Sequence, residues 1–172
     1  MTASPVDPTL DRLLRHMAWA NQRVIARLAE LPDAALTHTE PGSEWTVAMT
    51  LDHLVVAAIA YAARLDGGAW PDDRTPPMTT GELAGLADGC AAADARLRST
   101  AEQPDGIAEY TVEGQTRRRA RSTILGQAIH HATEHRAQIA GALAANGHVG
   151  PDGIDLDELD LWSYGAAEGL GA

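Results

Sequence analysis

The sequence has no lysine, no phenylalanine and a single cysteine, Cys90. With one cysteine, no disulfide can form within the chain, so the composition gives no sign of an oxidising compartment. All 13 basic residues are arginines and stand against 24 acidic residues, which leaves a formal net charge of -11. A surface so acidic repels phosphate backbones and anionic lipids, which argues against nucleic acid or a membrane surface as a partner.

The chain also lacks segments that would direct it to a membrane or across one. Its first ten residues have neither the basic stretch nor the apolar stretch of a signal peptide. The longest apolar-rich run, residues 47–63, is interrupted by Thr50, Asp52 and His53 and is shorter than the roughly 20 residues that a membrane span needs. We therefore expect a soluble cytoplasmic protein, and 172 residues fit a single domain over residues 1–172.

What the sequence does have is alanine-rich, helix-forming sequence in four long segments. The first helix is predicted from about Pro8 to Leu31 after the cap Asp7, and the second from Thr46 to near Gly67. The third helix is predicted to begin at the capping pair Thr79 and Glu82. The fourth is predicted to run from Ser122 or Thr123 to Asn146. Within residues 107–121, the stretch from Tyr110 to Thr116 predicts a short hairpin that turns at Glu113 and Gly114. The expected fold is an all-α four-helix bundle with a short hairpin or irregular segment before the last long helix.

Several residues interrupt or mark the apolar faces of these helices. Asn21 lies on the apolar seam of the first helix, and a buried amide needs partners, so it either fixes how the helices align or lines an internal cavity. Cys90 lies on the apolar stripe of the third helix, where we expect a buried thiol rather than a nucleophile. The second helix is apolar almost all round, which predicts that other helices or a second subunit surround it.

Charged residues are concentrated in two short stretches in the last third of the chain, one basic and one acidic. Four of the 13 arginines lie just before the last helix: Arg117, Arg118, Arg119 and Arg121. We interpret them as the solvated face of an edge strand, and the alternative is a small anion-binding patch for a carboxylate or phosphate. The acidic residues at 152–160 are interpreted as a solvated face. Trp162 and Tyr164, which follow them, predict that the chain packs back onto the helices.

Three of the seven histidines are placed to share a metal ion. His131 and His135 lie one turn apart on one helix face, which is the spacing with which a helix binds a transition metal, although an ordinary polar pair has the same spacing. His53 favours the metal, because a lone imidazole on an apolar helix is costly in a core but suits a ligand from a facing helix. Three neutral imidazoles suit Zn²⁺, Ni²⁺, Co²⁺ or Fe²⁺ and leave coordination positions open. We take zinc or nickel as the first choices.

The remaining histidines are given no ligand role. His130 is turned about 100° away from His131 and competes with it, but the residue four positions after His130 is Glu134 rather than a histidine. The site is not a zincin, because Ala132 stands where that motif needs a glutamate. Three further histidines lack such a pairing and are expected to be ordinary polar residues: His16, His38 and His148.

Three stretches of the chain combine tryptophan, asparagine and histidine in a recurring order. They are Trp19-Ala20-Asn21, then Trp45-Thr46 followed by His53-Leu54, and then His131-Ala-Thr-Glu-His135-Arg-Ala-Gln-Ile139. They resemble the W-x-N, W-(S/T)…HL and HxxxHRxQ(I/L) signatures of the DinB-like superfamily, which includes metal-dependent thiol transferases. The resemblance covers about residues 8–164. Ala137 stands where the family commonly has glycine, a departure that does not touch the histidines.

The resemblance implies a four-helix bundle, often dimeric, in which His53, His131 and His135 hold a divalent metal. Characterised relatives are similar to bacillithiol or mycothiol S-transferases or to mycothiol-dependent maleylpyruvate isomerase. The implied reaction is activation of a low-molecular-weight thiol for attack on a small electrophile. Two alternatives use the same three histidines: a metal-dependent hydrolase or isomerase, and a non-catalytic metal-binding stress protein.

Further residues are candidates for the surroundings of the metal. We expect Asn21, Trp45 and Gln138 to line the pocket. Glu134 is a candidate base by its proximity, with an exposed helix carboxylate as the alternative. Arg136 is a candidate holder of a substrate carboxylate, with a structural pairing to an acidic side chain as the alternative. The expected partners are a small-molecule substrate and a second copy of the chain in a homodimer, with neither nucleic acid nor a membrane.

Overall fold

The computed structural model describes residues 6–72 and 74–170, most of which are helical. The long helices are α1 (Pro8–Ala29), α2 (Val47–Asp66), α3 (Leu83–Ala101) and α4 (Arg121–Ala145). Two strands, β1 (Ile107–Val112) and β2 (Gln115–Ala120), precede α4. The short helical elements are η1 (Asp33–Thr37), η2 (Thr80–Glu82), η3 (Gly150–Asp152), η4 (Asp157–Leu159) and α5 (Leu161–Ala167).

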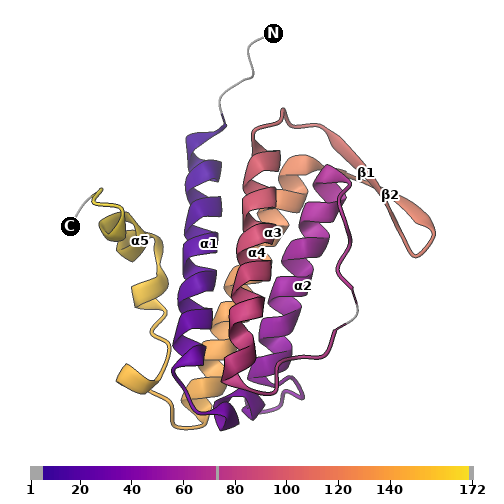
Figure 1. The fold of residues 1–172 in the computed structure, drawn as a ribbon. Coiled ribbons are helices and arrows are strands. Elements are labelled where there is room, and N and C mark those ends of the chain that lie inside the picture. The colour runs from indigo at the N-terminus through magenta and orange to yellow at the C-terminus, as the bar shows by residue number, and fades with distance from the viewer. Residues whose placement is uncertain (1–5, 73, 171–172) are drawn as a thin grey trace.

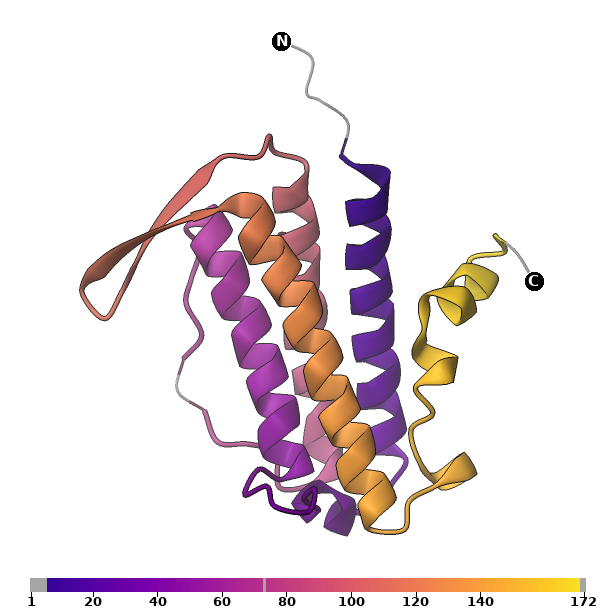
Figure 2. The ribbon, with the colours of Figure 1, turned by 180° about the vertical axis from the view of Figure 1, so that it is seen from behind.

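The four long helices lie side by side (Figure 1), and the view from behind agrees (Figure 2). α2 packs against both α3 and α4, whereas α1 packs mainly against α3 and makes fewer contacts with α4. α2 and α4, which carry the three candidate ligands, are therefore direct neighbours, as a shared site requires.

The ends of α1 and α2 are set by the capping residues that the sequence indicates. The Asp7 carboxylate accepts hydrogen bonds from two backbone N–H groups in the first turn of α1, and the Thr46 hydroxyl accepts one at the start of α2. Gly67 ends α2 with a φ of 68°, in the left-handed region that favours glycine. α1 ends at Ala29, two residues before the predicted Leu31.

The beginnings of α3 and α4 differ from the prediction. The Glu82 carboxylate accepts a bond from the Thr79 N–H as expected, but this cap starts the single turn η2, and α3 follows it. α4 begins at Arg121, and Ser122 does not cap it. Instead the Asp105 carboxylate, from the preceding loop, accepts bonds from the N–H and the hydroxyl of Ser122 at 3.0 and 2.8 Å. A carboxylate is favoured there by the partial positive charge of a helix N-terminus.

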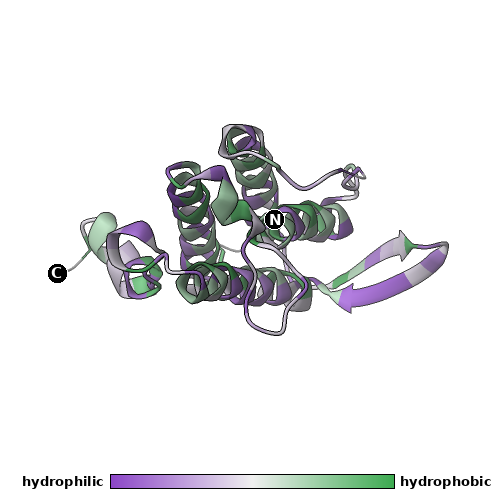
Figure 3. Ribbon diagram, turned by 90° about the horizontal axis from the view of Figure 1, so that it is seen from below, coloured by the Kyte–Doolittle hydropathy of each residue, from purple (hydrophilic) through white to green (hydrophobic). Residues whose placement is uncertain are grey.

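β1 and β2 form an antiparallel hairpin that projects from the side of the helices (Figure 3). The turn residues Glu113 and Gly114 both have a positive φ, 50° and 73°, as a two-residue hairpin turn demands. The hairpin is longer than predicted, because its strands extend to Ile107 and Ala120. Arg117, Arg118 and Arg119 are all exposed on β2, which confirms a solvated strand.

The core consists of two clusters of apolar side chains stacked along the helices. One cluster includes Val24, Leu28, Leu51, Val55, Leu86 and Leu143, and the other includes Leu14, Met17, Ala62, Leu97 and Leu125. Buried polar side chains lie where the clusters meet: in α1, Asn21 stands between Met17 of one cluster and Val24 of the other. The helices therefore hold a polar layer about halfway along their length.

α2 is long and apolar enough to cross a membrane by length and composition alone. The sequence argument that this region is too short is therefore wrong, because the helix continues past residue 63 and reaches 20 residues. Core helices of other proteins pass the same test, and 61% of the apolar window of α2 is buried. The burial confirms the prediction that α2 is surrounded by other parts of the protein.

The chain after α4 packs back against α1, as predicted, but through only one of the two aromatic residues. Tyr164 is 5% exposed, and its ring centre lies 5.4 Å from that of Trp19 and 5.8 Å from that of His16. Trp162 is 86% exposed, so the prediction is wrong for this residue. The reason is helical geometry, because residues two apart in α5 point about 200° away from one another.

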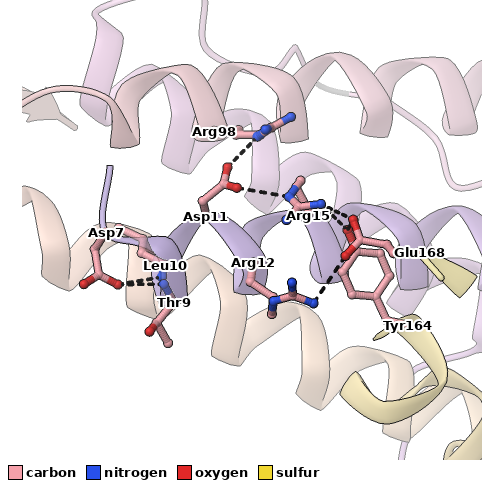
Figure 4. Close-up of polar contacts among 9 residues, drawn as sticks. All are labelled: Asp7, Thr9, Leu10, Asp11, Arg12, Arg15, Arg98, Tyr164 and Glu168. Atoms are coloured by element: carbon pink, nitrogen blue, oxygen red, sulfur yellow. Dashed lines mark hydrogen bonds and ion pairs between the residues drawn. The ribbon is translucent and has the colours of Figure 1, made fainter. Parts of the chain in front are cut away.

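Polar contacts fasten the same segment to α1 (Figure 4). Arg15 donates hydrogen bonds to the Tyr164 hydroxyl and to the Glu168 carboxylate, and Arg12 donates another to Glu168 at 3.3 Å. We call these four residues the C-terminal clamp. Asp11 supports it by accepting a hydrogen bond from Arg15 at 3.0 Å.

Candidate metal centre

The three predicted ligands meet between α2 and α4. His53 comes from α2 and His131 and His135 from α4, and their candidate ligand atoms all lie within 4.8 Å of one another. The Nε2 atoms of His131 and His135 are 3.1 Å apart. In a tetrahedral zinc site, metal–nitrogen bonds of about 2.0–2.1 Å place neighbouring nitrogens roughly 3.3 Å apart. The spacing of the histidines therefore suits a single small divalent ion.

The electrostatic environment keeps His53 and His131 uncharged at neutral pH. Burial, together with the neighbouring His135 and His53, lowers the pKa of His131 to about 4. Burial and then His135 also lower the pKa of His53, with Asp52 opposing them. A neutral imidazole offers a lone pair, which is the form that binds a metal.

Gln138 fixes the orientation of His135. Its Oε1 lies 2.6 Å from Nδ1 of His135. An amide oxygen only accepts hydrogen bonds, so Nδ1 carries the ring proton and the lone pair is left on Nε2. That Nε2 is the atom that faces His131. Such an outer contact is typical of histidines that bind metals, because it sets both tautomer and ring direction.

Trp45 forms a wall of the site. Its ring lies edge-on to His53, with centres 5.0 Å apart, and parallel to His135 at 6.3 Å. Beside it is a hollow of about 250 Å³. The hollow is lined by Glu40, Ser43, Trp45, Thr50, His135, Gln138 and Ala142. Trp45 and Gln138 thus lie where the sequence analysis expects pocket residues.

Three polar residues of this hollow were not foreseen: Glu40, Ser43 and Thr50. Glu40 and Ser43 lie in the loop before α2, where no periodic pattern marks them. The Glu40 side chain lies over Gly141 of α4, so closely that a Cβ at position 141 would collide with it. Gly141 was the available signal, since glycine in a helix interior is costly unless something packs against it.

Asn21 and Arg136 lie in the interior instead of the hollow. Arg136 is 4% exposed and donates hydrogen bonds to Asn21 Oδ1 at 2.7 Å and to Thr133 at 3.0 Å. Asn21 donates to Asp94 Oδ2 at 3.2 Å, and the Cys90 thiol lies 3.6 Å from the same oxygen. We call Asn21, Cys90, Asp94 and Arg136 the interior network. Asn21 also borders a small cavity of about 10 Å³ behind His131, which fits the second of its two predicted roles.

Burial governs the charges of the interior network. It lowers the pKa of Arg136 to about 10, which still leaves the guanidinium charged at neutral pH. It raises the pKa of Asp94 to about 6, although the hydrogen bonds from Asn21 and Cys90 act in the opposite direction. It also raises the pKa of Cys90, as expected for a buried thiol. Arg136 is buried, which argues against a role in binding a substrate carboxylate, and its hydrogen bonds go to Asn21 and Thr133 rather than to the acidic side chain that the structural alternative expects.

The other titratable candidates lie away from the three histidines. Glu134 is exposed, and its carboxylate lies 3.5 Å from Nδ1 of the exposed His130. His16 contacts the Leu159 carbonyl at 2.7 Å. His38 and His148 pair through their Nε2 atoms at 3.2 Å. This contact could not be predicted from the sequence, because the two residues are 110 positions apart.

Comparison with known proteins agrees with this geometry. No curated protein matched the chain. The DinB family matches residues 6–160, which include all four long helices and the three clustered histidines. The DinB family is a metal-binding family, and three histidines close together can hold such an ion. The chain therefore belongs to the DinB family.

Proposed function

We propose that this protein is a divalent-metal-dependent S-transferase built on the four-helix bundle of its family. His53, His131 and His135 hold one ion, zinc or nickel by preference, and a low-molecular-weight thiol of the mycothiol or bacillithiol type attacks a small electrophile beside it. The observation that carries the proposal is the convergence of three imidazoles next to an open hollow. Three protein ligands leave a coordination position for a reactant, as in catalytic rather than structural sites.

The residues around the ion have separate tasks in this proposal. A bound divalent ion supplies Lewis acidity, which lowers the pKa of a thiol or water at its open position. Gln138 holds His135 in its ligating tautomer. Trp45 gives a flat wall that shields one side of the site from water, and Glu40, Ser43 and Thr50 offer hydrogen bonds to the polar part of a thiol.

The metal is tested first, by mass spectrometry of tag-free protein that is purified without added metal. We expect about one divalent ion per chain, lost in His53→Ala. The matched control is His130→Ala, which removes an exposed histidine from another face of the same helix and is expected to keep the ion. If the wild-type protein binds neither Zn²⁺ nor Ni²⁺ when these are added back, the proposal is wrong.

The reaction is tested next, on the metal-loaded protein, with mycothiol or bacillithiol and a panel of small electrophiles. Consumption of both thiol and electrophile, abolished in His53→Ala, supports an S-transferase. Turnover of an ester or lactone without thiol would overturn this and assign a hydrolase to the same site. Metal binding with no turnover at all would instead indicate a non-catalytic metal-binding protein.

A further inference from the structure

Arg64, near the C-terminal end of α2, is framed by three aromatic rings. Its guanidinium carbon lies 5.3 Å from the ring centre of Tyr61, 5.0 Å from that of Trp70 and 5.5 Å from that of Tyr110. The rings come from α2, from the loop after it and from β1. Within the part of the chain that the structure describes, no ion pair joins Arg64 to a carboxylate. We call Arg64 and these three rings the arginine box.

The arginine box borders a hollow of about 400 Å³ between the end of α2 and β1. Two cationic side chains line it, Arg64 and Arg121. Arg121 is held in place by the carbonyl oxygens of Leu65 and Thr100, at 3.2 and 3.1 Å. Glu109 also lines the hollow, but its carboxylate pairs with Arg118 at 3.6 Å. The balance of charge in the hollow is therefore positive.

The register of the hairpin adds two more cations on the same side. Tyr110 is opposite Arg117, and Ala108 is opposite Arg119, so both arginines share the hairpin face that carries Tyr110. Ala108 is 6% exposed, which shows that this face is turned toward the helices. Positive charge is thus gathered at one end of a protein whose net charge is -11. Such a local field attracts anions in spite of the overall charge.

The aromatic rings also restrict how an anion can approach Arg64. Rings that lie against a guanidinium cover its flat faces and leave the N–H groups at its edge. A planar carboxylate pairs with that edge through two parallel hydrogen bonds. The free edge of the Arg64 guanidinium can therefore pair with two oxygens of a carboxylate or of a phosphate.

Tyr61 connects the arginine box to the candidate metal centre. Its ring centre lies 5.6 Å from that of His131 and 5.3 Å from the Arg64 guanidinium carbon, so one aromatic side chain separates the two. On α2 the positions between His53 and Arg64 on the same face are Ala57 and Ala60, at helical steps of four, three and four. These two alanines are small, but Tyr61 lies between His131 and Arg64, so the arginine box and the histidine cluster are separate sites.

We propose that the arginine box is an anion site of its own, separate from the histidine cluster, and that it binds a small molecule through a carboxylate or a phosphate group. The proposal goes beyond the proposed function and does not depend on it, because the hollow beside the arginine box and the hollow beside the three histidines share no lining residue. Arg64 binds the anionic group, and Trp70 and Tyr110 hold the guanidinium in place.

Binding is tested without the metal, by following the indole N–H of Trp70 in ¹H–¹⁵N NMR spectra while sodium malonate is added. We expect a saturable shift of Trp70 that sodium chloride at equal ionic strength does not reproduce, with no shift of the exposed Trp162. Arg64→Gln is expected to weaken malonate binding at least tenfold, and Arg64→Lys, which keeps the charge without the planar fork, to weaken it less. Arg23→Gln is the matched control, because the Arg23 guanidinium also lies against an aromatic ring, that of Trp19 at 5.2 Å, but does not line this hollow.

The outcome distinguishes this proposal from the proposed function. The metal-free measurement does not depend on metal binding, so a malonate site can exist even if the histidines bind nothing. No saturable shift in the wild type with either malonate or inorganic phosphate, or equal binding by Arg64→Gln, overturns the proposal, and the tighter binder of the two identifies the group that the site recognises. Circular dichroism checks the fold of each variant, and the half-conservative Arg64→Lys gives a second test if Arg64→Gln does not fold.

Discussion

Two polar sites lie at the same level of the helices and differ in how their hydrogen-bonding groups are used. α4 contributes to both through consecutive residues: His135 turns toward α2, and Arg136 turns toward Asn21 of α1. Neighbouring residues in a helix point about 100° apart, so one helix can serve two sites. In the interior network, donors meet acceptors within the protein, except at Asp94 Oδ1, which has no hydrogen-bond partner among the described residues. In the histidine cluster, the candidate ligand atoms of three imidazoles lie within 4.8 Å of one another, so a single ion can bind all three.

Burial acts on both sites but with opposite consequences. In the interior network the charge of Arg136 persists, since its pKa falls only to about 10, and Asn21 and Thr133 accept its hydrogen bonds. In the histidine cluster the pKa of His131 falls to about 4, and the loss of charge is what frees its lone pair. The comparison teaches that a buried polar group stabilises the fold when its hydrogen bonds are made within the protein. It is available for chemistry when a bound ligand has to supply the missing partner.

The largest effect is expected from breaking the interior network. Arg136→Ala leaves Asp94 buried without its nearby positive charge and leaves Asn21 without a donor, so the free energy of unfolding should fall by about 3–5 kcal/mol. Urea denaturation followed by circular dichroism measures this. Arg118→Ala, on the exposed hairpin, is the control and should change stability by less than about 0.5 kcal/mol. A loss as small as that for Arg136→Ala would show that the network is dispensable.

The next effect is the pH dependence that Asp94 imposes on stability. Its pKa is raised from 3.8 to about 6 in the folded protein, so the folded state keeps a proton that the unfolded chain has already released. Ionising Asp94 therefore costs stability as the pH rises from about 4 to about 6, by an amount on the order of 3 kcal/mol.

Asp94→Asn tests this directly. Relative to the variant, the wild-type protein should lose stability between pH 4 and pH 7, and the difference should level off above pH 7. The comparison is made by urea denaturation at each pH, so that the many other carboxylates cancel. A difference that does not change with pH would show that the pKa of Asp94 is the same in the folded and the unfolded protein.

A smaller effect, confined to the other site, is expected from Gln138→Leu. Without the amide oxygen, His135 is free to place its proton on Nε2, and the affinity for Zn²⁺ should fall about 10–100-fold, or roughly 1.4–2.7 kcal/mol. Competition with a chromophoric chelator measures the affinity. Gln127→Leu, at an exposed position of the same helix, should bind zinc like the wild type. Equal affinities for both variants would mean that Gln138 does not orient the ligand.

The smallest effect is expected from Cys90 in the interior network. Cys90→Ala removes one weak donor to Asp94 and one sulfur atom from the core, which should lower the free energy of unfolding by about 1 kcal/mol. In the wild-type protein the thiol should react with a disulfide reagent only after unfolding, because it is fully buried and its pKa is raised. Rapid reaction of the folded protein would show that the interior opens.

The sequence predicts those features that depend on neighbours in the chain. The caps Asp7 and Thr46 act within three residues, so helix starts could be located from them. The start of α4 could not, because its cap is Asp105, 17 residues before Ser122. In the same way the hairpin was located by its turn, whereas its full length depends on pairing that the turn does not specify.

The candidate site likewise contains residues that local sequence patterns predict and residues whose place depends on distant parts of the chain. Helical spacing and an unexpectedly polar position on an apolar helix were enough to bring His53, His131 and His135 into one hypothesis. The same spacing could not say which way Arg136 turns, because both a substrate carboxylate and a buried partner suit an arginine. Glu40 and Ser43 could not be predicted, because loop residues have no period and their place depends on how the loop folds over α4.

The C-terminal clamp bears on where this protein can be shortened. Similarity to the DinB family ends at residue 160, yet the residues that fasten the chain to α1 are Tyr164 and Glu168. A chain cut at residue 160 would keep every helix that carries a histidine ligand but would remove the Glu168 carboxylate from Arg12 and Arg15 and uncover the ring of Trp19. A boundary drawn from family similarity alone would thus produce a fragment with a newly exposed apolar surface, prone to stick to other copies of itself.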